Sequence, residues 1–465
     1  MALVFECVHT EGIAELSYLI GDDSVGIAAV IDPRTDVEIY LQLAQQHKVS
    51  ITHAFETHIH ADFVSGSREL CVQTGTAKVY ASIVGEAEYG FNVEAVHEGD
   101  KFEFGKLILT VRHTPGHTPE HISYEACEKG CDEPWGVFTG DSLFVNSAGR
   151  PDLLGKHADQ LAAQLYDTLF GYYAKLADGV IIYPSHGHGS PCGADIGDRL
   201  VSTIGYELRY NPYFQKKDRK DFVEYALSTA PPEPAFYKRL KKVNAEGPEV
   251  LGHLPVIPAL APQAFKDALD TKNTVLIDTR MMLAFGGGHI EGALNIGATP
   301  LLTIWAGWLI DPNDLILLVL ENDNAVEKIA GLFARSGFTK FAGYIVGGMT
   351  AWDNAGYPLV TLPQMTVHEL YTCTNKLQIL DVRDPSEWNT GHIPGATHMF
   401  LPEIQNRAGE LEKQKTVITY CATGYRASLA ASMLQRQGFK DVRTIPGSFS
   451  AWGKMGLPVE KEEKS

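Results

Sequence analysis

The chain has 465 residues, and a hydrophobic content of 45% is enough for the buried cores of about three domains. Its formal net charge of −18 makes nucleic acids and anionic membranes poor partners, and no apolar run approaches the ~20 residues that span a bilayer. The start, Met1 to Cys7, lacks the basic region and long apolar core of a signal peptide. Seven dispersed cysteines disfavour a disulfide framework, so we expect free thiols and a cytoplasmic location.

The first informative segment comes after an apolar stretch at 49–55, which predicts a strand. It reads Thr57-His58-Ile59-His60-Ala61-Asp62-Phe63. His58, His60 and Asp62 leave the strand together, so they can converge on one ion. Imidazole suits zinc and iron, and imidazoles mixed with carboxylates suit Fe(II). Single His-x-His pairs also occur by chance, so this segment alone does not establish a metal site.

Three further ligand-type residues strengthen the prediction of a metal site. They are His117 in Thr114-Pro115-Gly116-His117-Thr118, Asp141 in Phe138-Thr139-Gly140-Asp141-Ser142, and His186 in Pro184-Ser185-His186-Gly187. Each one follows an apolar run, at the expected end of a strand. Together with the first segment they place six ligand-type residues on four strand ends, which indicates a bound metal.

The order His-x-His-x-Asp, Gly-His, Gly-Asp and His resembles the metallo-β-lactamase superfamily over about residues 1–245. The resemblance implies an αββα sandwich with the metal between two sheets. Most dinuclear members have a histidine directly after the aspartate, where this chain has Phe63, so a second ion would lose a ligand. The sequence is then most similar to the persulfide dioxygenase branch, which uses one Fe(II).

By that resemblance, His58, His117 and Asp141 bind the iron. Two imidazoles and one carboxylate leave adjacent positions open, which O2 and a substrate sulfur can occupy together. The groups expected to orient these ligands and hold waters are His60, Asp62 and His186.

Four more residues are candidates for substrate binding. In the dioxygenase family the arginine that matches Arg150 helps bind the carboxylate end of a thiol peptide, with Asp152 nearby, because guanidinium pairs carboxylate bidentately. A surface salt bridge is the alternative for Arg150. Arg209 resembles a second family contact, although Leu208 stands where another arginine is often found. Cys192 is either a transient sulfur carrier or a packed thiol.

Prolines between 231 and 262 predict a linker with little regular structure. Beyond it the sequence repeats with a period of about one hundred residues, which suits tandem domains. The recurring motifs are Leu276-Ile277-Asp278-Thr279-Arg280 with Ile379-Leu380-Asp381-Val382-Arg383, Gly288-His289-Ile290-Glu291-Gly292-Ala293 with Gly391-His392-Ile393-Pro394-Gly395-Ala396, and Ala351-Trp352 with Ala451-Trp452. Apolar runs alternate with helical patterns, as at 417–420 and 426–437, which favours parallel α/β domains.

These repeats resemble rhodanese domains over about 260–460. The second copy carries Cys421-Ala422-Thr423-Gly424-Tyr425-Arg426-Ala427-Ser428 between an apolar strand and a helix. A cysteine there faces loop N–H groups and the positive end of the helix dipole, which favour the nucleophilic thiolate. Cys421 and Arg426 are the candidate catalytic residues, and a small buried thiol is the alternative. Related phosphatases place the arginine one position later, at Ala427 here, which disfavours phosphate chemistry.

The first copy departs from this pattern. Leu320 stands opposite Cys421, and Glu321 and Asp323 in the same loop would repel an anionic substrate. We therefore expect the first copy to be catalytically silent and to serve packing or docking.

The sequence predicts an α/β protein with three domains: a metallo-β-lactamase-like persulfide dioxygenase domain at 1–245, a rhodanese-like domain without the cysteine at 246–360, and a rhodanese domain with Cys421 at 361–465. The expected activity is oxidation of a low-molecular-weight persulfide by O2 to sulfite and thiol, with one Fe(II) per chain, as in sulfide detoxification. Rhodanese sulfur transfer would form or consume thiosulfate.

Several alternatives stay open at this point. The carrier thiol of the persulfide can be glutathione, coenzyme A, bacillithiol or cysteine. The chain can instead be a thioester hydrolase of the hydroxyacylglutathione hydrolase type with two zinc ions, or a non-enzymatic sulfur-relay or docking protein. A homo-oligomer is possible, and no nucleic acid or membrane partner is expected.

Overall fold

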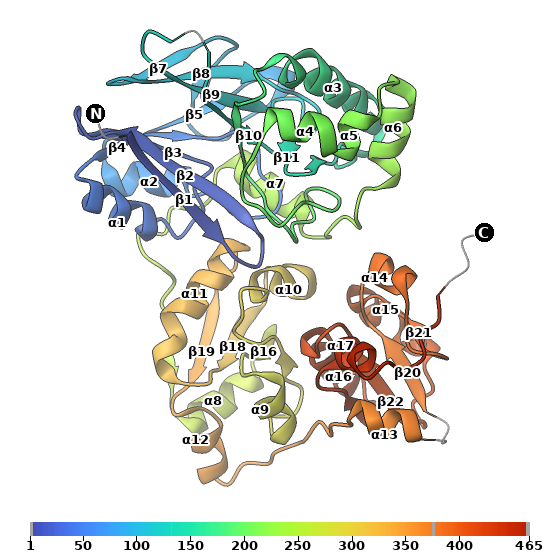
Figure 1. Cartoon of the computed structure of the whole chain (residues 1–465). Helices are drawn as coiled ribbons and strands as arrows, with labels where there is room; N and C mark the ends of the chain where they lie inside the picture. The colour runs from blue at the N-terminus through green and yellow to red at the C-terminus, as the bar shows by residue number, and fades with distance from the viewer. Residues whose placement is uncertain (1–2, 132, 374–376, 462–465) are drawn as a thin grey trace. The chain divides into compact units, whose positions relative to one another are not determined.

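The computed structural model describes residues 3–131, 133–373 and 377–461 (Figure 1). The chain divides into two compact units. The first unit comprises Met1–Leu254 together with Gly331–Phe338, and the second comprises Pro255–Ala330 and Thr339–Ser465. Within the described ranges, no helix combines the length and apolarity needed to cross a membrane.

The first unit contains two six-stranded sheets. The first sheet has the order β1-β2-β3-β4-β5-β6, with β1 (Leu3–Thr10), β2 (Glu15–Asp22), β3 (Ile27–Ile31), β4 (Ser50–Phe55), β5 (Lys78–Ser82) and β6 (Glu94–Val96). The second has the order β14-β13-β10-β9-β8-β7, with β7 (Lys101–Phe104), β8 (Leu107–His113), β9 (Ile122–Glu128), β10 (Gly136–Gly140), β13 (Ile181–Pro184) and β14 (Ser202–Thr203). A small hairpin of β11 (Leu143–Phe144) and β12 (Ser147–Ala148) follows β10.

The core of this unit lies between the two sheets, and β2 shows why. Every residue of β2 is buried, because successive side chains of a strand point to opposite faces and both faces are covered. Tyr18 and Ile20 pack with Phe138 of the second sheet. Leu19, on the other face, packs with Tyr40 of a covering helix. The strand also buries three polar residues, Glu15, Ser17 and Asp22.

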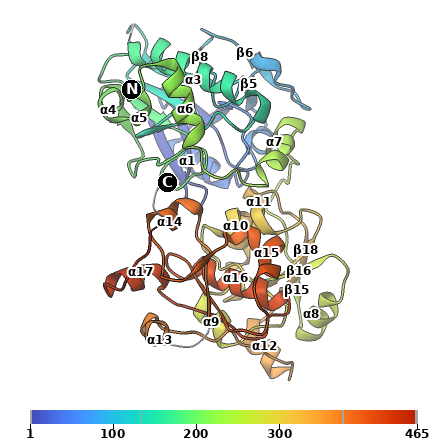
Figure 2. The same ribbon diagram turned by 90° about the vertical axis from the view of Figure 1, so that its right-hand side faces the viewer.

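Helices cover both outer faces of the pair of sheets. α1 (Glu38–His47) and α2 (Ser67–Thr74) pack on the first sheet. On the second sheet lie α3 (Ala158–Gly171), α4 (Ile204–Tyr210), α5 (Pro212–Gln215) and α6 (Arg219–Ser228), which group together in both ribbon views (Figure 1, Figure 2). In α3 the buried residues Leu161, Leu165 and Leu169 recur at helical spacing. The result is the predicted αββα sandwich, and that part of the fold class is confirmed.

The prediction of a linker with little regular structure is wrong in part. α7 (Tyr237–Glu246) forms between the flanking prolines. Tyr237, Leu240 and Asn244 are buried and spaced for one helix face, and Gly247, with a φ of 102°, ends the helix. The prolines interrupt the chain on either side of this segment, so they do not prevent the helix.

The second unit contains two sheets of parallel strands. The first has the order β15-β19-β18-β16-β17, with β15 (Ala259–Leu260), β16 (Thr274–Asp278), β17 (Leu294–Asn295), β18 (Leu315–Val319) and β19 (Phe341–Ile345). Its helices are α8 (Pro262–Leu269), α9 (Met282–Gly287), α10 (Leu302–Leu309), α11 (Val326–Arg335) and α12 (Gly348–Asn354).

The second sheet repeats this arrangement with the order β21-β20-β22-β23. Its strands are β20 (Gln378–Asp381), β21 (Thr397–His398), β22 (Val417–Tyr420) and β23 (Val442–Thr444). Its helices are α13 (Val367–Thr372), α14 (Pro385–Thr390), α15 (Ile404–Arg407), α16 (Tyr425–Arg436) and α17 (Ser448–Lys454). Trp352 and Trp452 are both 3% exposed, as expected of core residues. The predicted pair of parallel α/β domains is confirmed.

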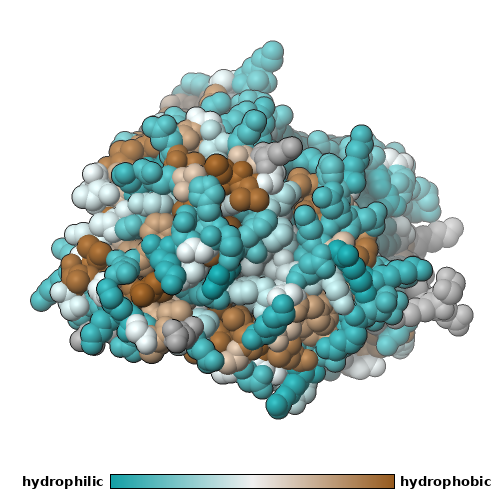
Figure 3. Space-filling view, turned by 90° about the horizontal axis from the view of Figure 1, so that it is seen from above, coloured by the Kyte–Doolittle hydropathy of each residue, from teal (hydrophilic) through white to brown (hydrophobic). Residues whose placement is uncertain are grey.

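The surface in Figure 3 is mostly hydrophilic, and its hydrophobic residues form several separate groups. Scattered apolar residues of this kind are ordinary for a folded domain, because polar surface is insufficient to cover it.

Candidate functional site

Three strand ends place potential metal donors in one buried cluster. His58 follows β4, His117 lies between β8 and β9, and Asp141 follows β10. Their donor atoms lie within 4.8 Å of one another. Asp141 Oδ2 is 3.8 Å from His58 Nε2 and 3.5 Å from His117 Nε2. The structure therefore brings together the three residues that the sequence predicts as iron ligands.

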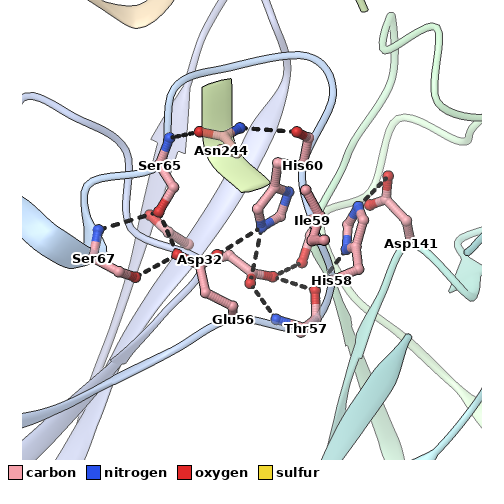
Figure 4. Close-up of polar contacts among 12 residues, drawn as sticks. Asp32, Glu56, Thr57, His58, Ile59, His60, Ser65, Ser67, Asp141 and Asn244 are labelled. Atoms are coloured by element: carbon pink, nitrogen blue, oxygen red, sulfur yellow. Dashed lines mark hydrogen bonds and ion pairs between the residues drawn. The ribbon is translucent and has the colours of Figure 1, made fainter. Parts of the chain in front are cut away.

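Hydrogen bonds to the opposite ring nitrogens orient the two histidines. The Thr57 hydroxyl donates to Asp32 Oδ2 at 2.8 Å, so its oxygen accepts from His58 Nδ1 at 2.9 Å (Figure 4). His117 Nδ1 donates to the Arg150 carbonyl at 2.9 Å. Both Nε2 atoms are thereby left as lone-pair acceptors that face the cluster.

Asp141 presents one free carboxylate oxygen to these nitrogens. Its Oδ1 accepts from His186 Nδ1 at 2.7 Å, whereas the buried Oδ2 has no hydrogen-bond partner among the described residues. Burial would raise the pKa of Asp141, but His186 outweighs burial and holds that pKa below its ordinary value. Burial lowers the pKa values of His58 and His117. An ionised carboxylate and two neutral imidazoles fit a divalent transition metal.

Asp62, His186 and Cys192 form a second donor cluster beside the first. His186 donates from Nδ1 to Asp141 Oδ1 and from Nε2 to Asp62 Oδ2, each at 2.7 Å. Burial would lower the pKa of His186, but the two carboxylates raise it well above its ordinary value. A protonated ring with both N–H groups engaged has no lone pair for a second ion.

His60 belongs to a third cluster, with Asp32 and Glu56 (Figure 4). Its Nε2 lies 3.1 Å from Asp32 Oδ1 and 3.3 Å from Glu56 Oε2, at ion-pair distance but without hydrogen-bond geometry. Burial would lower the pKa of His60, but Asp32 raises it well above its ordinary value. The ring packs between His58 and the buried Phe63, with centroids 4.2 and 4.5 Å away. His60 thus lies next to the donor cluster and faces away from it.

Asn244 of α7 holds the loop that carries His58, His60 and Asp62. Its Oδ1 accepts from the Ser65 backbone N–H at 2.9 Å. Its Nδ2 donates to the carbonyls of His60 and Phe63 at 2.8 and 2.7 Å. Figure 4 shows this residue bridging two parts of the loop. The unpredicted helix α7 is therefore part of the support of the metal cluster.

Sequence reasoning missed Asp32, Glu56 and Asn244. Asp32 directly follows β3, so the signal that identified Asp141, a carboxylate at a strand end, was available for it. Asn244 carried no such signal, because its segment was predicted as linker. His121 accepts the Asp141 backbone N–H on Nε2 at 2.9 Å and so fixes that strand end.

Arg150, which is buried, pairs near the cluster with Asp152, which is partly exposed. Arg150 donates from Nε and Nη2 to Asp152 at 2.8 and 2.7 Å, in the bidentate geometry that guanidinium favours. The Arg150 side chain is 2% exposed, so this is not a surface salt bridge. Its carbonyl holds His117, and its backbone N–H donates to the Cys192 carbonyl at 3.0 Å.

The other two substrate candidates have different surroundings. Cys192 is buried, with Sγ 3.5 Å from the Tyr237 hydroxyl, and burial raises the pKa of its thiol. Arg209 lies in α4 with a side chain that is 71% exposed, 3.8 Å from Asp178. The structure brings Cys192 to the metal-donor region and leaves Arg209 at the surface of the unit.

A second site candidate lies in the second unit, where Cys421 follows β22. Its Sγ accepts the Gly424 backbone N–H at 3.1 Å. Gly424 is the N-cap of α16, with a φ of 115° that favours glycine. The thiol therefore sits at the N-terminus of a helix of 12 residues, where N–H groups and the helix dipole stabilise an anion.

Arg426 is held by carboxylates of α14 and its N-cap. Its Nη1 and Nη2 donate to Glu387 at 2.5 and 2.8 Å, and Asp384 lies 3.9 Å away. The guanidinium places positive charge near Cys421. Both of its terminal nitrogens already donate to Glu387.

The fold and these two sites define an αββα metal-binding domain followed by a pair of α/β domains, one of which has a cysteine loop. Family models agree with this division. The metallo-beta-lactamase superfamily model matches residues 11–186, and the rhodanese-like domain model matches 261–355 and 366–455. The chain belongs to the metallo-β-lactamase superfamily and carries two rhodanese-like domains, as the sequence predicts.

Individual relatives divide between two activities. The chain is 36% identical over 171 residues to the cytoplasmic hydroxyacylglutathione hydrolase of Arabidopsis thaliana, which covers 37% of this chain and 62% of that protein. It is 29% identical over 198 residues to the mitochondrial persulfide dioxygenase ETHE1 of Bos taurus, which covers 42% of this chain and 70% of that protein. The chain thus spans 62% of the length of the plant hydrolase.

The chain is also similar to a solved structure over most of its length. The metallo-beta-lactamase from Staphylococcus aureus subsp. aureus COL is 33% identical, with a TM-score of 0.67. The match covers 74% of this chain and 99% of that one.

Proposed function

We propose that this chain oxidises a low-molecular-weight persulfide with O2, using a single Fe(II) held by His58, His117 and Asp141. The observation that carries the proposal is the buried Asp141 Oδ2, which has no hydrogen-bond partner among the described residues and faces two lone-pair nitrogens. When bound, Fe(II) supplies the redox chemistry that activates O2 and open positions for the persulfide.

The reaction balances without a further co-reactant. A persulfide, O2 and water give a thiol, hydrogen sulfite and one proton. The S–S bond breaks, the terminal sulfur takes three oxygen atoms and is oxidised, and O2 is reduced. The departing thiolate takes up a proton and leaves as the thiol.

The residues around the donors have distinct roles in this proposal. Thr57 and the Arg150 carbonyl keep Nε2 of each histidine available. His186 holds the Asp141 carboxylate in place. Arg150, paired with the partly exposed Asp152, is the candidate contact for a carboxylate of the carrier thiol. Glutathione, coenzyme A, bacillithiol and cysteine persulfides all remain candidate substrates.

The second half of the proposed function is sulfur transfer at Cys421. A persulfide on Cys421 would pass its outer sulfur to sulfite, which forms thiosulfate and returns the Cys421 thiolate. The Gly424 N–H at 3.1 Å and the N-terminus of α16 would stabilise the anionic forms of this residue. In the reverse direction the Cys421 thiolate would take sulfur from thiosulfate and release sulfite, and a carrier thiolate would then take the outer sulfur from Cys421 to give the persulfide substrate and return the Cys421 thiolate.

A thioester hydrolase with two metal ions is the second candidate. The similarity to the Arabidopsis thaliana hydrolase and the Asp62, His186 and Cys192 cluster support it. The engagement of both His186 nitrogens by carboxylates disfavours it, because a second ion would have to replace one of these hydrogen bonds.

An oxygen-electrode assay of the iron-loaded protein with glutathione persulfide tests the proposal, together with metal analysis and quantified sulfite and thiosulfate. We expect one iron per chain, O2 uptake that depends on persulfide, and no hydrolysis of S-lactoylglutathione. Two zinc ions per chain with thioester hydrolysis and no O2 uptake would instead establish the hydrolase. Sulfur transfer without O2 uptake and without thioester hydrolysis would indicate a sulfur-relay protein.

A further inference from the structure

Helix α16, which follows the Cys421 loop, is buried on all sides. Every residue from Ala427 to Leu434 is buried. A helix that packs only on its own sheet leaves one face in solvent. In this unit the remaining face contacts the other rhodanese-like copy, which has no cysteine at the equivalent position.

Asn295 of that first copy makes the central polar contact with α16. The Ser428 hydroxyl donates to Asn295 Oδ1 at 2.6 Å, and the Asn295 backbone N–H donates to Ser432 Oγ at 3.1 Å. All three residues are at most 3% exposed. Asn295 Nδ2 donates to the carbonyls of Asp278 and Arg280 at 3.2 and 2.9 Å. The Asn295 amide is therefore fixed by its own domain and offers its oxygen to α16.

A second contact reaches the cysteine loop itself. The Tyr425 hydroxyl donates to the Gly297 carbonyl at 3.1 Å. A Cβ built on Gly424 would lie 2.6 Å from Met282 Sδ, so this glycine packs directly on the first copy. Gly424 is the residue whose N–H donates to Cys421 Sγ.

We propose that Asn295 of the cysteine-free copy is a positioning residue for Cys421. It fixes Ser428, whose backbone N–H donates to the Gly424 carbonyl at 3.0 Å in the first turn of α16. Gly424 in turn holds its N–H on the sulfur. The first copy thus contributes the support that keeps the anion-stabilising N–H in place. The inference rests on the proposed sulfurtransferase function of Cys421.

The charged groups around the loop stay the same when Asn295 changes. Arg426 is paired with Glu387 and Asp384, and Arg383 is paired with Asp381. A change in Cys421 reactivity on substitution of the neutral Asn295 would therefore report the position of the loop.

The test measures alkylation of Cys421 by iodoacetamide in the full-length protein, followed on the Cys421 peptide by mass spectrometry at pH 7 and pH 9. In Asn295→Ala we expect the rate at pH 7 to fall about 3–10-fold, the size expected for weakening one hydrogen bond to a thiolate. At pH 9 the alkylation rates of the wild type and of Asn295→Ala should converge, because the thiolate then forms without the help of the Gly424 N–H. Thiosulfate sulfurtransferase kcat should fall by a similar factor with little change in KM.

Ser428→Ala removes the same hydrogen bond from the other side and provides an independent variant. If the bond carries the effect, the double variant should be no worse than either single one. Gln435→Ala is the matched control, because it removes a contact at the other end of α16, from Gln435 Nε2 to the Thr361 carbonyl at 2.9 Å, in the segment that joins the two copies. It should leave both rates unchanged.

Two outcomes overturn the inference: an unchanged ratio of the rates at the two pH values in both single variants, or faster alkylation at both pH values, which would mean that the copies only shield the thiol. Alkylation needs no sulfurtransferase activity. A wild-type protein that transfers no sulfur would therefore refute the proposed function, and the alkylation rates would still decide the role of Asn295.

Discussion

The two rhodanese-like copies differ most at one position. β18 is followed by Leu320 and β22 by Cys421, and both residues are 1% exposed. In the first copy a carboxylate of Asp323 accepts the Gly347 N–H at 3.2 Å. In the second copy the equivalent Gly447 N–H donates to the Thr423 carbonyl at 3.3 Å. The first loop is closed by an acidic side chain, whereas the second is closed by a backbone contact and its Gly424 N–H donates to the sulfur.

The features that the copies share are structural. Asp278 pairs with Arg280, and Asp381 pairs with Arg383, each with a shortest contact of 2.6 Å. Each arginine also donates to the carbonyl of the glycine before the histidine that both copies contain, at 2.8 Å. The motifs that make the repeat recognisable therefore hold the fold together. The shared motifs therefore indicate a rhodanese-like fold, whereas the loop after the central strand determines whether a copy can do sulfur chemistry.

Cys421→Ser should have the largest effect, because it removes the sulfur that the loop of the first copy lacks. Thiosulfate formation should fall to background, because a serine hydroxyl stays protonated near neutral pH and cannot hold sulfane sulfur. O2 uptake should continue and release sulfite. Leu320→Val is the matched control in the first copy and should leave the ratio of thiosulfate to sulfite unchanged. If the Cys421→Ser variant forms thiosulfate at the wild-type rate, sulfur transfer does not occur at Cys421. Cys192 would then be the next candidate.

His117→Ala tests whether sulfur transfer belongs to the second copy alone. Loss of one of three donors should empty the metal centre and abolish O2 uptake, whereas transfer of sulfur from thiosulfate at Cys421 should persist. His60→Ala should cost less, roughly 10–100-fold in O2 uptake, as for other residues that support metal ligands. Iron content by elemental analysis and O2 uptake check both variants. Normal iron and turnover in His117→Ala would remove this residue from the donor set.

Asp278→Ala and Asp381→Ala test whether the shared motif stabilises both copies. Each variant leaves a largely buried guanidinium without its carboxylate, which should lower the free energy of unfolding by about 3–5 kcal/mol. Urea unfolding of the full-length protein, followed by fluorescence, measures this loss. A large effect in only one copy would show that the two pairs have different roles despite their matching geometry.

Much of this fold could be predicted from the sequence, because the decisive signals are local. The second copy shows this: a strand at 417–420 and a helix at 426–437 were expected, and β22 and α16 span Val417–Tyr420 and Tyr425–Arg436. His58, His117 and Asp141 could be grouped because strand ends on one edge of paired sheets lie close together. Ligand-type residues in such positions are informative even when they are far apart in the sequence.

The supporting residues could not be predicted from local pattern. Asn244 contacts the metal-binding loop only because α7 packs there, and the prolines around α7 indicated a linker. His60 has the spacing of a metal donor, but Asp32 and Glu56 hold its ring. The contact of Asn295 with Ser428 joins two domains of the second unit. In each case the partner is set by tertiary packing.

Trp352→Phe and Trp452→Phe should have the smallest effects and would sharpen the comparison most finely. Each indole N–H donates to a proline carbonyl six residues later, to Pro358 at 3.0 Å and to Pro458 at 2.8 Å. Phenylalanine keeps most of the buried ring area but loses this donor, so each variant should lose about 1 kcal/mol of stability. Thiosulfate formation should stay at the wild-type rate in both, because neither indole lies in the Cys421 loop. Urea midpoints of the single and double variants measure the losses, which should add to within about 0.5 kcal/mol if the two bonds act independently. A clearly non-additive result would instead show that the contact between the copies couples their stability.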